Sequence, residues 1–181
     1  MPKLSDWTLY HRAVRDVRGE ELLPLNSLQQ IYPDVYEREA AKYVGREQLR
    51  SAPVEALGCG WGDVLFFSPV HPKALLDVVR ASGREVPPLR FWAINAAALE
   101  ASAAYVLQVR PWPNGVYTPY QLKDFLPYDA ETLQVVSQPS QTTLSRLQAL
   151  PPEAPLLLWS DVPHVLYRGT LCLGVVSEEW C

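Results

Sequence analysis

Apolar and charged residues alternate along the chain with two different periods, which separate the predicted helices from the predicted strands. Over residues 33–44 the apolar positions recur every three or four residues, charged residues fill the opposite side, and Gly45 ends the pattern. Pro33 suits a helix start because its missing N–H is not needed at the first position. Helices or helical turns are predicted over 27–32, over 33–44, from Pro72 to a stop at Gly83, and over 96–101, 119–125 and 140–150.

Short runs of β-branched and aromatic residues predict the strands. Their predicted ranges are 7–10, 63–68, 89–94, 104–109, 133–137, 156–159, 165–167 and 170–176. The last two are expected to form a hairpin that turns at Arg168 and Gly169. Helices gather in the first half of the chain and strands in the second. The pattern therefore predicts an α+β fold with a mixed or split β-sheet in one globular domain, residues 1–181.

Length, charge and the absence of long apolar runs limit the ligands and the cellular compartment that we expect for this domain. The chain has 181 residues, enough to bury a core, and a formal net charge of -4 without a run of five like charges. General nucleic-acid binding is therefore not expected. No apolar run approaches the roughly 18 residues of a membrane span, and the N-terminus has no apolar leader segment. We expect a cytoplasmic protein that does not contact membranes.

Three histidines are the first candidates for chemistry near neutral pH. His11, His71 and His164 each border a predicted strand, where functional side chains often project. The alternative role for each is structural, with the ring bonded to a backbone carbonyl. Their sequence spacing matches no metal-binding motif, and the three cysteines form no CxxC pair, so no metal is expected.

Two further features support other functions. Cys59 can be combined with His164 and Asp161 into a cysteine hydrolase triad, although the surrounding glycines also fit a simple turn. Trp112 lies in a proline-rich loop, where an exposed indole could contact a protein partner or fold back over the core. A non-catalytic protein-interaction domain is therefore an alternative to an enzyme.

Two segments together resemble the ADP-ribosyltransferase superfamily, in particular its small bacterial members, the RES-domain toxins and the DNA-targeting toxins. The first segment is Leu-Tyr-His-Arg-Ala at 9–13, and the second is Asp-Val-Leu-Phe-Phe-Ser-Pro at 63–69, followed by the predicted helix at Pro72. The resemblance implies a split-sheet fold, NAD as the cofactor, and either transferase or NAD glycohydrolase activity. It also allows an inactive relative that binds NAD.

The resemblance also implies roles for individual residues. Tyr10 and His11 would lie on the ribose side of NAD, while Phe67 and Ser68 would lie beside the nicotinamide. With His164, the residues His11 and Ser68 form the expected catalytic set. The superfamily carries a glutamate on a third strand to steer the sugar cation, whereas this chain has His164 at the corresponding strand entry.

Overall fold

Two antiparallel sheets form the centre of the molecule. The computed structural model describes residues 1–111 and 113–181. The first sheet has the order β1-β6-β11, from strands Thr8–Arg12, Arg90–Asn95 and Val176–Trp180. The second has the order β5-β9-β7-β8, from Leu65–Phe67, His164–Tyr167, Ala104–Leu107 and Phe125–Pro127. Two short ribbons accompany them: β2 (Glu21–Leu22) with β10 (Leu171–Cys172), and β3 (Pro53–Val54) with β4 (Cys59–Gly60).

One bridge joins the two sheets. Tyr10 of β1 and Ser68, just after β5, exchange two backbone hydrogen bonds of 2.8 Å each. Every strand pair in the described residues is antiparallel, so the split arrangement is the one that the chain adopts. The expected α+β class is confirmed.

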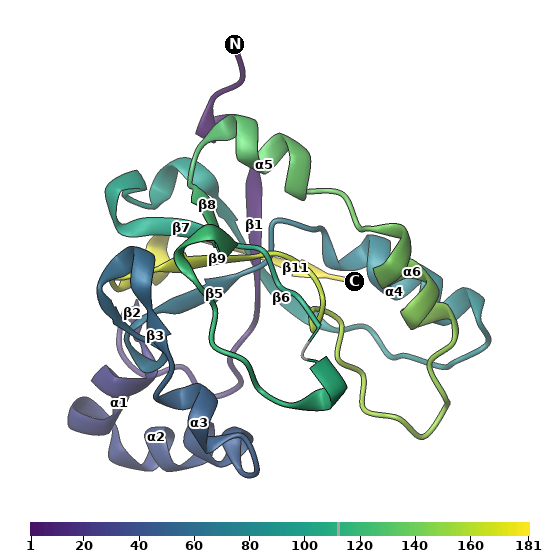
Figure 1. Ribbon diagram of the computed structural model, residues 1–181, viewed down its shortest axis with the longest axis horizontal. Coiled ribbons are helices and arrows are strands. Elements are labelled where there is room, and N and C mark those ends of the chain that lie inside the picture. Colours follow the sequence, from purple (N-terminus) through teal and green to yellow (C-terminus); the bar gives the residue numbers. More distant parts are fainter. Residues whose placement is uncertain (112) are drawn as a thin grey trace.

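The helices gather at opposite ends of these sheets, as Figure 1 shows. The α-helices are α1 (Leu25–Ile31), α2 (Pro33–Ala40), α3 (Glu47–Arg50), α4 (Pro72–Ala81), α5 (Ala130–Val136) and α6 (Gln141–Gln148). The 3-10 turns are η1 (Leu4–Asp6), η2 (Ala41–Tyr43), η3 (Glu55–Leu57), η4 (Trp61–Asp63), η5 (Ala96–Ala98), η6 (Ala101–Ala103), η7 (Pro113–Gly115), η8 (Leu122–Asp124) and η9 (Leu173–Val175). Helices α1 to α3 lie together at one end, and α4 and α6 pack on each other at the other. In the part of the chain that the structure describes, no helix is long and apolar enough to cross a bilayer.

Three clusters of buried side chains hold these layers together. Leu133 and Val136 of α5 cover the region where the two sheets meet. Leu75 and Leu76 of α4 pack with Leu147 of α6 in a second cluster, and all three are fully buried. Burial of one such leucine stabilises the fold by about 1.5–3 kcal/mol before the entropy loss is counted. The third cluster lies under α3 and η4.

A close backbone approach fixes α1 against η4. The Asn26 side chain donates a hydrogen bond of 2.7 Å to Asp63, and a Cβ atom at Gly62 would lie 2.5 Å from Asn26 Oδ1. Only glycine fits there without displacing Asn26. The N-cap of α1 is Pro24, so Asn26 lies within the helix and its side chain is free to hold α1 against η4.

Two predicted strands and the predicted hairpin are wrong. Residues 133–137 belong to helix α5, where Asp129 caps the first turn by accepting from Thr132 N–H. Residues 156–159 form no strand. The predicted hairpin at Arg168 and Gly169 does not form either, because β5 and β7 already pair with both sides of β9. The segment after it pairs with β2 as β10 and then with β6 as β11.

Candidate functional site

A cavity of about 1130 Å³ lies where the sheets meet the α1–α2 end of the molecule. Strand residues of β1, β5 and β6 and the first residue of β9 form one side, and the 13–18 loop, α1, α2 and η2 form the other. This volume of about 1130 Å³ is slightly larger than the roughly 300–1,000 Å³ of typical small-molecule pockets. The cavity can therefore hold a ligand as large as a dinucleotide.

His11 contributes an unprotonated ring nitrogen to this cavity. Its Nδ1 lies 2.7 Å from the carbonyl oxygen of Arg12. A carbonyl only accepts, so Nδ1 carries the proton and Nε2 keeps its lone pair. The ring stacks on Trp92 at 5.9 Å between centroids and meets the edge of Phe67 at 5.8 Å. Burial lowers the pKa of His11 below its usual value, so the ring is neutral at pH 7.

His164 has the same arrangement at the start of β9. Its Nδ1 lies 2.6 Å from the carbonyl oxygen of Val162, so this ring also keeps its lone pair on Nε2. Burial lowers the pKa of His164. Both rings line the cavity, and in the described part of the chain neither Nε2 makes a hydrogen bond. The cavity therefore has two neutral hydrogen-bond acceptors that are able to act as bases.

The lining of the cavity is positively charged, although the whole chain is negative. Seven of its side chains are cationic and three are anionic, while the net charge of the chain is -4. The cationic residues are Arg12, Arg15, Arg18, Arg38, Lys42, Arg46 and Arg110, and the anionic residues are Asp16, Glu21 and Glu39. A positively charged lining of this kind attracts anionic ligands.

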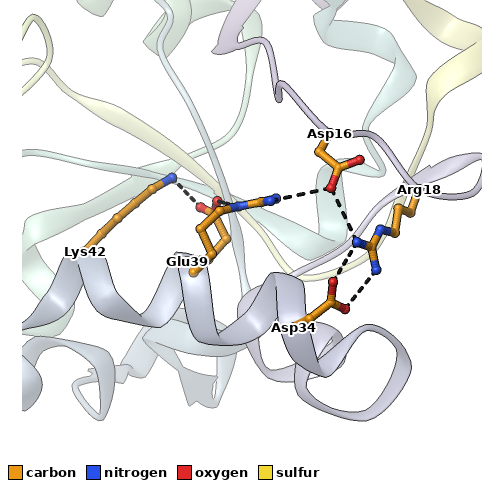
Figure 2. A network of polar contacts seen from close by, with 6 residues as sticks. Asp16, Arg18, Asp34, Glu39 and Lys42 are labelled. Carbon is orange, nitrogen blue, oxygen red and sulfur yellow. Dashed lines mark hydrogen bonds and ion pairs between the residues drawn. The ribbon is translucent and has the colours of Figure 1, made fainter.

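Part of this charge is neutralised by a network between the 13–18 loop and α2. Arg18 pairs with Asp34 at 2.6 Å and with Asp16 at 3.4 Å, as Figure 2 shows. Glu39 pairs with Lys42, which approaches it from one turn further along. These contacts fasten the loop to the helix on one side of the cavity. They are largely exposed, so water and salt screen them and each adds little to the stability of the fold.

Three arginines of the lining are left without a carboxylate partner. Among the described residues, no ion pair involves Arg12, Arg15 or Arg46. The Arg12 guanidinium lies 5.1 Å from the centre of the Phe91 ring. Burial and the charge of Arg15 together lower the pKa of Arg12. Two neighbouring cations without a counter-charge are well suited to hold a phosphate group.

Aromatic rings line a further part of the cavity. Trp61 stacks nearly parallel to Tyr120, with 6.3 Å between ring centres and an angle of 10°. Phe66 packs against Trp61 at 4.7 Å and against His164 at 6.4 Å. Flat apolar faces beside cationic groups are the combination that a nucleotide requires.

The residues expected from the resemblance separate into two groups. His11 and His164 line the cavity, whereas Ser68 does not. The Ser68 side chain is 2% exposed, and its hydroxyl donates to the carbonyl oxygen of Val70 and accepts from the N–H of the same residue. Ser68 therefore stabilises the turn after β5. It does not reach the cavity.

Tyr10 and Phe67 also lie outside the lining. Tyr10 packs against His71 at 4.6 Å between ring centres. Phe67 is 2% exposed, and its ring packs against the His11 ring at an angle of 61°. Phe66 reaches the cavity in its place, because side chains alternate along β5.

The alternative triad of Cys59, His164 and Asp161 is not assembled. Asp161 binds the Arg146 guanidinium through two hydrogen bonds of 2.8 Å, and His164 Nδ1 is bonded to a backbone carbonyl. Cys59 is absent from the cavity lining, and burial raises the pKa of its thiol. A raised pKa disfavours the thiolate that a nucleophile requires.

Trp112, whose indole could contact a partner or fold back over the core, lies outside the described residues. No protein-family model, curated protein or solved structure matches this chain. The cationic side chains of α2 and of the 13–18 loop match no sequence motif. Only the fold brings them together around one cavity.

Proposed function

We propose that this protein binds NAD in the cavity, as an ADP-ribosyltransferase-like domain. One observation carries the proposal: an acidic chain surrounds one large cavity with an excess of arginine and lysine and places two neutral histidines on its wall. NAD combines a negatively charged diphosphate, two riboses and two flat rings. The cavity offers a partner for each of these groups.

The diphosphate is assigned to the arginines that have no carboxylate partner. Arg12 and Arg15 are close enough to influence each other, and Arg46 lines the same cavity. Guanidinium groups bind phosphate through paired N–H donors, and this contact strengthens where water is excluded. A bound diphosphate would also relieve the repulsion between Arg12 and Arg15.

A ribose hydroxyl is assigned to His11. Its Nε2 accepts a hydrogen bond only while the ring is neutral, and its lowered pKa keeps the ring neutral at pH 7. The bond from Nδ1 to the Arg12 carbonyl fixes the direction of the ring. This role agrees with the position that the resemblance gives to His11. His164 is available as a second acceptor or as a base.

Turnover is a separate question from binding. The resemblance implies that the bond between nicotinamide and ribose breaks, with a carboxylate stabilising the sugar cation. Among the carboxylates of the lining, Asp16 and Glu39 pair with arginine or lysine. Glu21 accepts a hydrogen bond of 2.9 Å from the Thr170 hydroxyl. Binding is therefore the function that the geometry supports best, and cleavage is tested in the same sample.

A proton NMR titration of NAD with the whole chain tests both points. We expect the NAD signals to broaden with the wild type, and free nicotinamide to accumulate over hours if the protein is active. His11→Asn keeps a donor for the Arg12 carbonyl but removes Nε2, and should weaken binding about tenfold, the effect of one lost hydrogen bond. Arg15→Gln should weaken it by a similar factor.

Arg84→Gln is the matched control, because it removes a cation outside the cavity lining and should leave binding unchanged. Sharp NAD signals at millimolar protein and ligand would reject the proposal. A protein-interaction role would then become the better hypothesis. Binding that Arg15→Gln and Arg84→Gln weaken equally would place NAD elsewhere on the surface.

A further inference from the structure

A second cluster of reactive side chains lies outside the cavity, where β11 ends beside the start of α4. His71 is the N-cap of α4, and Glu179 and Cys181 come from the end of the chain described here. One donor atom from each of the three residues lies within 4.8 Å of the others. His71 Nε2 is 2.8 Å from Glu179 Oε1, and Cys181 Sγ is 3.9 Å from the same oxygen.

The donor set is one that borderline-soft divalent ions prefer. Imidazole nitrogen, carboxylate oxygen and thiolate sulfur all bind Zn²⁺, at about 2.0–2.3 Å, so tetrahedral ligands lie roughly 3.3–3.6 Å apart. To hold an ion, His71 Nε2 and Glu179 Oε1, now 2.8 Å apart, must separate by about 0.5 Å. The widest separation, up to 4.8 Å, must close by about 1 Å, which side-chain rotation at the partly exposed His71 and Glu179 allows. The His71 and Glu179 side chains are 39% and 36% exposed, so an ion from solution can reach them.

The charges around the cluster favour a cation. Glu179 brings a carboxylate oxygen into contact with both the His71 ring and the Cys181 thiol. Lys73 lies on the first turn of α4, but its ammonium group pairs with Asp77. A divalent ion would supply the missing positive charge and favour the thiolate.

We propose that His71, Glu179 and Cys181 bind a divalent transition metal ion of the Zn²⁺ type and leave a fourth position open to solvent. Binding displaces the thiol proton of Cys181 to solvent. The imidazole proton moves from Nε2 to Nδ1, which gives up the hydrogen bond that it accepts from Lys73 N–H. The ring remains neutral, and one proton is released for each ion bound.

Equilibrium dialysis against Zn²⁺, followed by metal analysis of the protein, tests the proposal. We expect one ion per wild-type chain. Cys181→Ser and His71→Asn should each weaken binding by more than about tenfold. Asparagine at position 71 can still cap α4, so this variant keeps the fold while it removes the ring nitrogen. Circular dichroism of each variant confirms that it is folded.

Cys172→Ser is the control for the sulfur, because Cys172 is an exposed thiol outside the cluster. With Co²⁺ as the probe, the wild type and Cys172→Ser should show a thiolate-to-cobalt absorption band, and Cys181→Ser should not. Absence of bound Zn²⁺ in the wild type would overturn the proposal. Zn²⁺ bound by Cys181→Ser and by His71→Asn as tightly as by the wild type would overturn it as well. NAD binding is not involved in either readout.

Discussion

At the scale of single residues, two histidines of the cavity make the stability of the fold depend on pH. His11 and His164 both have a pKa below the usual value, and burial is the main cause in each case. In the unfolded chain both rings return to a pKa of about 6.5. The unfolded state therefore binds protons at a pH at which the folded state does not.

This difference predicts how stability depends on pH. Above about pH 6.5 both states are neutral at these two rings, and their contribution to the free energy of unfolding is fully present. As the pH falls below 6.5, the unfolded chain takes up protons first, and that contribution is lost until the folded-state pKa values are passed. Urea denaturation at pH 7.5, 6.5 and 5.5 should show stability falling over the lower interval.

Asparagine variants isolate the two rings. His11→Asn and His164→Asn keep a donor for the backbone carbonyl and do not titrate. In the double variant the decrease between pH 6.5 and 5.5 should be smaller than in the wild type. An equal decrease in both proteins would show that other groups cause it and that these rings are not held neutral by the fold.

Single residues also show where sequence analysis succeeds and where it stops. His11 and His164 were found because histidine beside a strand is a recognisable signal, and both reach the cavity. Ser68 also lies at the end of a predicted strand, but its hydroxyl donates to the carbonyl oxygen of Val70 and accepts from the N–H of Val70. Hydrogen bonding to a residue two positions away depends on the turn geometry, which the order of residues alone does not specify.

At the scale of elements, the Arg146 side chain holds a segment that the sequence predicts to be a strand. Residues 156–159 have the apolar composition of a strand, but the Arg146 side chain of α6 donates to the carbonyl oxygens of Leu157 and Leu158. The same guanidinium holds Asp161 through two bonds of 2.8 Å. Burial acts to raise the pKa of Asp161, but the contact with Arg146 outweighs it and lowers that pKa.

We therefore predict that Arg146→Lys is strongly destabilising. An ammonium group cannot make the same set of directed bonds, because the planar guanidinium offers donors in several fixed directions. The expected loss in free energy of unfolding is about 1.5–3 kcal/mol, the range for hydrogen bonds to charged groups. Urea denaturation measures it.

Arg38→Lys provides the comparison for this substitution. The Arg38 side chain is 48% exposed, and its ion pairs are long, at 3.5 Å and 3.7 Å. Its replacement should change stability by less than about 0.5 kcal/mol. If the two variants lost the same stability, the Arg146 contacts would not be the ones that hold this segment.

Helix α5 shows why another element was predicted wrongly. Its valines favour a strand locally, yet Ala130, Leu133 and Val136 are spaced by three and all face the core. The cap residue Asp129 and this spacing favour a helix, whereas the β-branched content of the segment favours a strand. The hairpin at Arg168 and Gly169 is different. Both sides of β9 pair with distant strands, which no local pattern indicates.

At the scale of the whole molecule, charge is distributed unevenly. The chain carries a net charge of -4, whereas the cavity collects more cations than anions. Such a distribution lets a protein that repels anions over most of its surface attract one at a single site. Neither composition nor net charge predicted it, because it arises when the 13–18 loop, α2 and η2 close over the sheets.

The uneven charge leads to a prediction about salt. If the unpaired arginines attract the ligand, its affinity should fall as NaCl rises from 10 to 200 mM, since the screening length shrinks from about 30 Å to less than 10 Å. Arg46→Gln should make this dependence shallower. It should leave the melting temperature within about 4 °C, because Arg46 donates one hydrogen bond, to the Lys42 carbonyl oxygen, and forms no ion pair in the described residues. Calorimetric titration of NAD at four salt concentrations gives the slope of affinity against salt for each protein, with Arg84→Gln as reference.

A slope that the wild type and both variants share would mean that general surface charge, and not the cavity, attracts the ligand. A shallower slope in Arg46→Gln alone would place the negative charge of the ligand beside this arginine.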